Sequence, residues 1–236
     1  MCGCPPRSGA LRYNAAKCTR IGVRIATMSD NQRPRLVLAT QNPGKRREFL
    51  SLLPNLGAEL ILPSDLGLDL DVAETGATYA ANARLKSQAL AEATGLIALG
   101  DDSGIEVECL GGAPGLYSAR YAGPGASDAD RRRKLLHEVG QFPRPWLARF
   151  VCVISVAVPQ PGGGLTLTEF EGECRGEIAT EERGHNGFGY DPIFWLPDRG
   201  ATMAELPDDL KNTISHRGRA VQAAEGYLRG LVAGER

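Results

Sequence analysis

Residues 75–104, TGATYAANARLKSQALAEATGLIALGDDSG, contain the step from helix to strand on which the fold class depends. The alanine-rich segment 75–94 predicts a helix that ends at Gly95. The apolar residues 96–99 predict a buried strand, and the segment GDDSG at 100–104 predicts the turn that ends it.

Segments on both sides of this stretch continue the alternation. Upstream, a strand, a helix and a second short strand are expected at 35–40, 45–53 and 58–62. Downstream, the patterns predict a helix, a β-hairpin and a closing helix at 127–139, 149–173 and 214–232. Strands and helices interleave early and a hairpin comes late. We therefore expect an α/β fold with a mixed β-sheet flanked by helices.

The composition of the 236-residue chain is that of a globular protein with one substantial core, with 42% hydrophobic and 23% charged residues. No apolar run approaches the length of a membrane-spanning helix, so we expect no membrane association. Residues 1–29 carry five basic residues and no acid, which leaves 22 basic against 28 acidic residues in the remainder. A body this acidic is unsuited to an extended nucleic-acid surface, although it leaves room for a small basic pocket.

The N-terminal stretch differs in composition from the rest. Residues 1–33 are expected to form an N-terminal extension that is disordered or precedes a true start at Met28, and residues 34–236 to form a single domain. A mitochondrial transit peptide is the alternative, because such peptides are rich in arginine and poor in acids. The six cysteines have irregular spacing and no paired CxxC pattern, so no zinc site is expected. We expect a reducing, cytoplasmic compartment.

The loop Thr40–Lys45, TQNPGK, is a candidate phosphate site. A loop between a strand and a helix N-terminus presents backbone N–H groups and the positive end of the helix dipole, and the lysine adds a positive charge. The loop is not a Walker P-loop, because its leading glycine is missing and Arg46 stands where serine or threonine should be. A plain turn with a solvated lysine is the alternative.

The acidic pair Asp101 and Asp102 is a candidate metal site. Two adjacent carboxylates repel each other unless a cation lies beside them, and Mg²⁺ commonly takes one or two carboxylates plus substrate phosphates. Glu74, just before the predicted helix, is a candidate second acid, whereas a simple turn is the alternative interpretation. On that helix Asn82 and Lys86 are four residues apart and share a face.

Two further segments suit a nucleobase. In the glycine-rich segment 184–191, GHNGFGYD, the backbone is able to approach a ligand, the ring of Phe188 to stack on a base, and Asp191 to accept from a purine N–H. Lys211, His216 and Arg217 lie around one helix start and offer donors to an oxo-substituted ring or a phosphate. An ordinary loop and a surface histidine are the alternatives.

Taken together and in this order, the motifs of the chain resemble those of the inosine triphosphate pyrophosphatase family (dITP/XTP pyrophosphatases). The motifs are TQNPGK, ETG-x5-N-x3-K, DDSG-I, GGAPGLYSARYAG, GFGYDPIF and K-x3-SHRG. The resemblance runs from about Arg35 to the C-terminus. It implies an elongated α/β protein of two lobes with a central active-site cleft, and a homodimer. The implied activity is Mg²⁺-dependent hydrolysis of noncanonical purine nucleoside triphosphates (dITP, ITP and XTP) to the monophosphate and pyrophosphate, which cleanses the nucleotide pool.

The resemblance also implies residue roles. Asp102 would be the catalytic base and, with Glu74, a metal ligand, while Lys86 would be the second catalytic residue. The implied substrate-binding residues are Thr40, Gln41, Asn42, Pro43, Gly44, Lys45, Ser103, Phe188, Gly189, Tyr190, Asp191, Lys211, His216 and Arg217. Two positions depart from the family pattern: Ala73 replaces a second acid beside Glu74, and Gln41 replaces a small residue.

Two other functions fit the same motifs. A related pyrophosphatase with a different nucleotide preference, such as for modified pyrimidines, shares the reaction and differs only in the base. A nucleotide-binding regulator without turnover is the second alternative, and the intact acids Asp101, Asp102 and Glu74 together with Lys86 argue against it.

Overall fold

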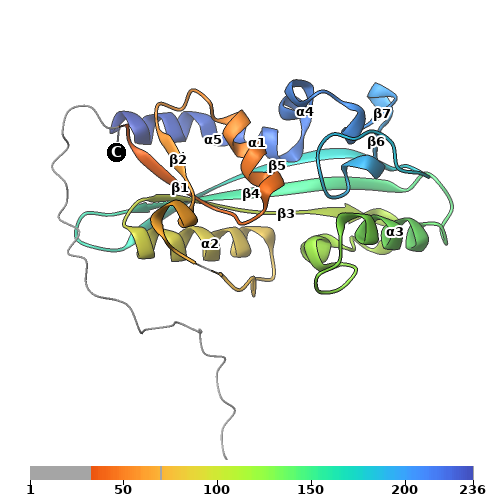
Figure 1. Ribbon diagram of the computed structural model, residues 1–236, viewed down its shortest axis with the longest axis horizontal. Helices are drawn as coiled ribbons and strands as arrows, with labels where there is room; N and C mark the ends of the chain where they lie inside the picture. The colour runs from red at the N-terminus through yellow and green to blue at the C-terminus, as the bar shows by residue number, and fades with distance from the viewer. Residues whose placement is uncertain (1–32, 70, 236) are drawn as a thin grey trace, which may run out of the picture. The chain divides into compact units, whose positions relative to one another are not determined.

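The computed structural model describes residues 33–69 and 71–235. Their strands form one seven-stranded mixed sheet in the order β2-β1-β3-β4-β5-β6-β7 (Figure 1). The strands are β1 Arg35–Ala39, β2 Glu59–Ile61, β3 Ile97–Val107, β4 Leu147–Pro159, β5 Leu165–Ile178, β6 Phe194–Leu196 and β7 Ala201–Thr202. The helices are α1 Pro43–Leu52, α2 Tyr79–Thr94, α3 Asp128–Val139, α4 Asp208–Ile214 and α5 His216–Ala233. Since β1 pairs in parallel with β2 and β3 while the other neighbours are antiparallel, the predicted mixed α/β sheet is confirmed.

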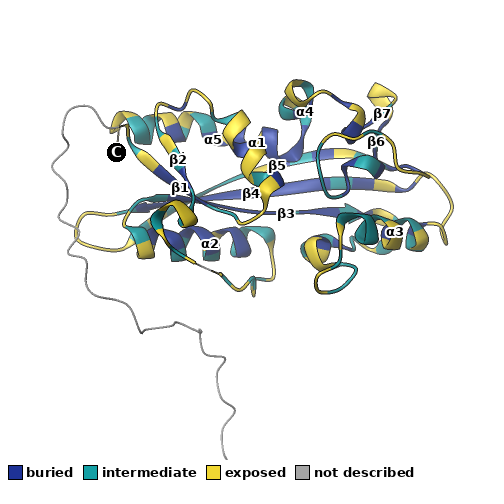
Figure 2. Ribbon diagram, in the orientation of Figure 1, coloured by how far each residue is buried: buried dark blue, intermediate teal, exposed yellow. Residues whose placement is uncertain are grey.

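Hydrophobic side chains form cores at two ends of the long strands. Near β1, α5 covers one face of the sheet and α2 the other, with Leu99 and Leu90 among the buried residues. At the far end, α3 and the short strands β6 and β7 enclose a separate core around Ile105, Phe150 and Phe194. Figure 2 shows the middle strands and the inner helix faces buried, and the outer helix faces exposed. The strands β3, β4 and β5 therefore connect two packed regions.

An unpaired edge of β3 lies between these regions. The ladder between β1 and β3 ends at the pair Ala39 and Gly100, whereas β3 runs on to Val107 and pairs there with β4. Within the described residues, the only strand-type contact on the other side of this stretch is an isolated bridge between Glu106 and Pro114. After β1 the chain leaves the sheet and begins α1. Side chains from both faces of β3 therefore reach the gap at this free edge.

The predicted turn at 100–104 is wrong, because these residues lie within β3. The glycines on either side of the acids serve close packing instead of turning the chain. A Cβ on Gly100 would lie 2.3 Å from the backbone oxygen of Ala83, and one on Gly104 would lie 2.4 Å from that of Gly115. Glycine inside a strand often marks such a close backbone approach.

The helix predictions hold more closely. The helix expected over 127–139 is α3, and the Ser127 hydroxyl caps it by accepting from the backbone N–H of Asp130. The closing helix begins at His216 and not at 214, because Ser215 is the C-cap of α4 and the N-cap of α5. The helix expected over 75–94 begins at Tyr79, after the N-cap Thr78.

The predictions for the N-terminal extension and its targeting alternative concern residues 1–32, which lie outside the described residues. Residues 33–236 form one unit by themselves. Across 33–69 and 71–235, no helix combines the length and the apolar character needed to cross a bilayer.

Candidate active site

Asp101 and Asp102 are neighbours in β3, so the alternation of a strand puts their side chains on opposite faces of the sheet. Asp101 lies on the side of α1 and α5, where its Oδ2 is 2.9 Å from Lys45 Nζ and 3.2 Å from Arg217 Nη2. Both cations lower the pKa of Asp101 well below its usual range, although burial alone would raise it. Asp101 is therefore a permanent anion that holds two cations.

Asp102 lies on the side of α2, in a cluster of alternating charges. Lys86 Nζ lies 3.0 Å from Asp102 Oδ1 and 2.6 Å from Glu74 Oε1. The amide of Asn82 donates to the second Asp102 oxygen at 3.1 Å, and Arg120 approaches the second Glu74 oxygen at 3.1 Å. Burial raises the pKa of Asp102, and Lys86 and Asn82 only partly oppose that shift.

The donor set of this cluster fits a magnesium ion that is shared with substrate. Among the described residues, no group of three or more His, Cys, Asp or Glu side chains could hold a metal on its own. Mg²⁺ usually takes only one or two carboxylates and completes its shell with water and substrate phosphates, and Asp102 and Glu74 provide such a pair. The Lys86 ammonium between them shows that this spot favours positive charge. Ala73 adds no ligand, but Asp71 lines the same side of the cleft, which the sequence did not suggest.

The loop before α1 is held by its own asparagine. Asn42 is the N-cap, and its Oδ1 accepts from the backbone N–H of Gly44 at 2.8 Å and of Lys45 at 3.2 Å. The N–H groups of Gly44 and Lys45, which the loop was expected to present to a phosphate, are therefore occupied by the cap. Thr40, Gln41, Asn42 and Lys45 line the cleft, so the loop offers phosphates these residues and the helix dipole.

The aromatic ring of Phe188 packs against the first turn of α1 and forms a wall of the cleft. A Cβ on Gly44 would lie 2.6 Å from the ring of Phe188, so the ring occupies the space that this glycine leaves. Asp191 fixes the glycine-rich segment, because its Oδ2 accepts from the Phe188 N–H at 2.8 Å and from Lys211 Nζ at 2.6 Å. The cations of Lys211 and Arg217 lie 5.4 Å and 5.8 Å from the ring centre.

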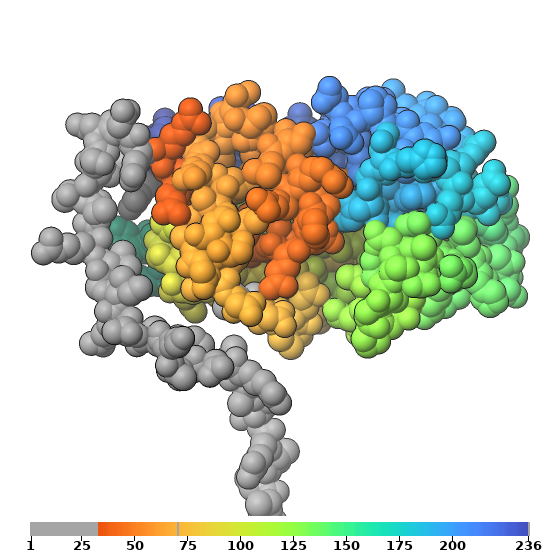
Figure 3. All heavy atoms as spheres, in the orientation of Figure 1, coloured from red at the N-terminus to blue at the C-terminus, as the bar shows by residue number. Residues whose placement is uncertain are grey.

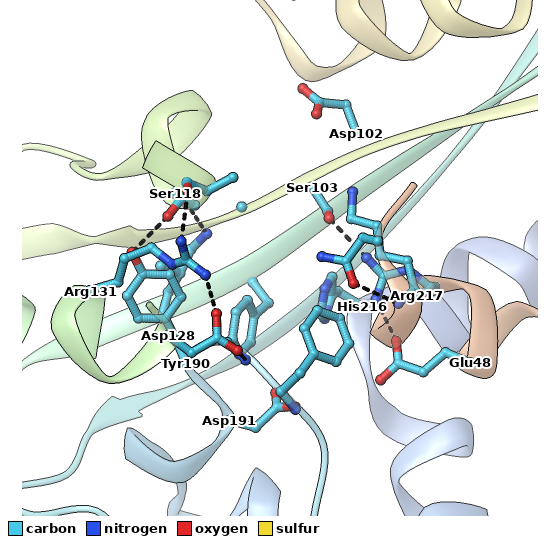
Figure 4. A pocket seen from close by; sticks show the side chains of 18 of the residues that line it. Glu48, Asp102, Ser103, Ser118, Asp128, Arg131, Tyr190, Asp191, His216 and Arg217 are labelled. Atoms are coloured by element: carbon cyan, nitrogen blue, oxygen red, sulfur yellow. Dashed lines mark hydrogen bonds and ion pairs between the residues drawn. The ribbon is translucent and has the colours of Figure 1, made fainter. Parts of the chain in front are cut away.

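His216 and Arg217 begin α5, and in Figure 4 a dashed line joins Arg217 to Ser103. The imidazole of His216 stacks on Phe150 with ring centres 4.6 Å apart, and its buried Nδ1 has no hydrogen-bond partner among residues 33–69 and 71–235. Burial and neighbouring cations hold the pKa of His216 well below its usual range, so the ring is neutral. Arg217 is 1% exposed and donates through Nη2 to Ser103 Oγ at 2.9 Å.

These groups line one cleft, which opens between the orange segment and the green and cyan segments of Figure 3. The predicted residues that line the cavity between Asp102 and Phe188 are Asn42, Lys45, Glu74, Asp102, Ser103, Phe188, Gly189, Tyr190, Asp191, His216 and Arg217. Thr40, Gln41 and Lys86 line an adjoining cavity. Lys211 lines a third cavity, behind Phe188. Pro43 and Gly44, the first two residues of α1, line none of the three.

The sequence did not single out several residues of the cleft. These are Glu48, Ser118, Asp128 and Arg131. Glu48 had a usable signal, since it follows Lys45 by one turn of a predicted helix, and Ser118 lies within the motif GGAPGLYSARYAG. The others depend on contacts between distant segments: Asp128, for example, accepts from the backbone N–H of Gly189 at 2.8 Å.

A family model described as the Ham1 family matches residues 36–227. A dITP/XTP pyrophosphatase of Staphylococcus epidermidis is 47% identical over 195 residues, which is 83% of this chain and 96% of that protein. The structure of the Staphylococcus aureus Ham1 protein is 43% identical with a TM-score of 0.73, covering 84% of this chain and 99% of the other. The Coxiella burnetii HAM1 protein is 41% identical with a TM-score of 0.74, covering 83% and 98%.

Proposed function

Because the chain belongs to the Ham1 family, we propose that it hydrolyses noncanonical purine nucleoside triphosphates (dITP, ITP and XTP) to the nucleoside monophosphate and pyrophosphate. The observation that carries the proposal is the pairing of two subsites in one cleft. A carboxylate–ammonium cluster around Asp102 adjoins an aromatic wall at Phe188 with buried donors beneath it. Relatives that share nearly their full length with this chain are named dITP/XTP pyrophosphatases.

Hydrolysis of a phosphoanhydride asks mainly for positioning and charge neutralisation. Asp102 and Glu74 are the residues that would hold Mg²⁺, and the ion when bound supplies neutralisation of the phosphate charge. Lys45 and Lys86 line the same cavity and would neutralise the charge of the triphosphate. Asp102 accepts the proton of the attacking water as the bond between the α- and β-phosphates breaks, which is the role of a general base.

Base selection follows from Arg217 and His216, two donors that line the same cavity as Phe188. Hypoxanthine and xanthine present an acceptor oxygen at position 6, where adenine presents an amine. Arg217 donates to that oxygen in our proposal, and adenine would leave the donor unpaired in a buried site. The neutral His216 offers its unpartnered Nδ1 to the same edge of the base. Guanine carries the same oxygen, so this contact selects against adenine only.

We also propose the homodimer that the resemblance implies, and a cytoplasmic location. The cysteines in the described part of the chain, Cys109, Cys152 and Cys174, are free thiols, which agrees with a reducing compartment. Sedimentation of the purified protein tests the dimer.

Pyrophosphate release tests the central proposal. The full chain with Mg²⁺ should release pyrophosphate from ITP, dITP and XTP far faster than from ATP, and chelation of the metal should abolish release from all of them. Faster release from modified pyrimidine triphosphates would favour the related pyrophosphatase. Binding of ITP without release would favour the regulator.

A further inference from the structure

The glycine-rich segment 184–191 has a permissive backbone on both sides of its aromatic residue. Gly184, Gly187 and Gly189 have positive φ angles of 80°, 76° and 62°, and glycine moves easily between such conformations and others. Phe188 lies between two of these glycines, so the local chain alone does not fix the direction of its ring. Contacts with other elements therefore decide where the ring lies against α1.

The helix α3 binds the middle of this segment through the backbone of Gly189. Asp128 Oδ2 accepts from the Gly189 N–H at 2.8 Å, and Arg132 Nη1 donates to the Gly189 carbonyl oxygen, also at 2.8 Å. The two side chains are four residues apart on α3, so they share one face of the helix. Both backbone polar groups of one residue are therefore bound by one helix.

Arg132 also contacts the chain that precedes the segment. Its Nη2 lies 2.8 Å from Glu182 Oε2, while its Nη1 binds Gly189. The arginine side chain is 13% exposed, whereas that of Glu182 is half-exposed. Because the guanidinium is planar and rigid, it makes these two contacts in one fixed geometry. Arg132 thus connects the two ends of the segment.

Asp128 is itself fixed by contacts outside the segment. Its Oδ1 pairs with Arg131 (Figure 4), and Arg131 donates to the backbone oxygens of Ala119 at 2.9 Å and Ala126 at 2.7 Å. The acceptor for the Gly189 N–H is therefore in place whatever the segment does.

These contacts restrict Phe188 at both of its peptide groups. The N–H of Phe188 itself donates to Asp191 Oδ2 at 2.8 Å, and the N–H of the next peptide group, that of Gly189, donates to Asp128. Peptide groups are planar, so fixing the two that flank a residue fixes its φ and ψ. The direction in which the ring of Phe188 leaves the chain then follows.

We infer that Arg132, together with Asp128, is a positioning residue for nucleotide binding, which holds Gly189 and thereby sets the place of the Phe188 ring. The inference rests on the proposed function, with the base against this ring. Arg132 lines none of the three cavities of the cleft, so it acts through the segment and not through contact with the nucleotide. Every base has a face that stacks, so this role affects all purine nucleotides alike.

Arg132→Gln tests this role, because glutamine is too short and uncharged to bind Gly189 and Glu182 together. We expect KM for ITP to rise roughly three- to tenfold, the size expected for the net loss of one hydrogen bond, while kcat stays within about twofold. KM for ATP should rise by the same factor, so the ITP-to-ATP ratio of kcat/KM should hold. Amide hydrogen exchange in the segment 184–191 should become faster, because Gly189 loses one of its two contacts with α3.

Two further variants give the control and the rescue. Arg133→Gln is the matched control, since Arg133 is the next residue of α3 and forms an exposed pair with Asp130. It should leave KM and the exchange unchanged. Arg132→Lys keeps one charged donor for the Gly189 carbonyl, so it should return KM most of the way to the wild-type value.

A wild-type KM in Arg132→Gln, or a rise confined to ITP, would overturn the inference. A lower melting temperature and kcat at unchanged KM would also overturn it, because that is the pattern of a side chain that only stabilises the fold. So would an Arg132→Lys variant no better than Arg132→Gln. Failure of the wild-type chain to release pyrophosphate from ITP would instead refute the proposed function, and the exchange measurement would still report whether Arg132 holds the segment.

Discussion

At the scale of single residues, the surroundings of two adjacent carboxylates shift their pKa values in opposite directions. Lys45 and Arg217 hold the pKa of Asp101 down, whereas burial raises the pKa of Asp102. Neighbouring acids with separated pKa values are a recurrent sign of divided roles. Asp101 serves as a fixed anion for the cations of one face, and Asp102 is left for chemistry on the other.

Asp102→Asn should retain the fold and lose most turnover, because an amide neither accepts the proton nor ligates Mg²⁺ well. We expect kcat for ITP to fall roughly 100- to 10,000-fold, the usual contribution of a general base. Mn²⁺ binding, followed by electron paramagnetic resonance, should weaken in parallel. Near wild-type kcat would remove Asp102 from the mechanism.

Asp101→Asn is the informative comparison for that variant. It takes a partner from each of two cations, Lys45 and Arg217. Breaking a buried ion pair from one side costs about 3–5 kcal/mol. We therefore expect a clearly lower melting temperature for Asp101→Asn than for Asp102→Asn, and equal melting temperatures would contradict the division of roles.

At the scale of elements, the sequence predicted the helices and the hairpin well, because local periodicity and caps such as Ser127 determine them. It misplaced the end of β3, since Gly100 resembles a turn residue until the contact with α2 is known. The site residues that the resemblance implies lie in one cleft, and most of them line the cavity between Asp102 and Phe188. The spacing of Glu48 from Lys45 was a local signal, but its pairing with Arg217, 169 residues away, has no local pattern that could predict it.

A further prediction concerns the start of α1. A methyl group at Gly44 would lie 2.6 Å from the Phe188 ring, so Gly44→Ala must displace the aromatic wall. Stacking of a base on such a ring is worth ~1–3 kcal/mol, so KM for ITP should rise roughly 5- to 100-fold. Gly226→Ala on α5 is the control, because its added methyl group meets nothing within 4 Å and helix propensity favours alanine. An unchanged KM in Gly44→Ala would show that the ring does not receive the base.

At the scale of the whole described unit, the cleft lies between two cores that share only the long strands β3, β4 and β5. Its walls come from both sides: Lys45 and Asp102 from the side of α1 and α2, and Asp128 and Tyr190 from the side of α3. A nucleotide in the cleft contacts groups that are assembled only in the folded chain. Binding should therefore stabilise the unit as a whole.

The reaction product IMP makes this measurable without turnover. At 100 times its dissociation constant, a ligand specific for the folded state adds about 2.7 kcal/mol of stability. For a chain of this size each kcal/mol raises the melting temperature by roughly 2–4 °C, so IMP should raise it by about 5–10 °C. AMP at the same concentration should raise it far less, because its 6-amino group is unable to accept from Arg217. In Arg217→Ala the two nucleotides should become similar. Equal shifts with IMP and AMP in the wild-type chain would mean that the buried donors do not read the base.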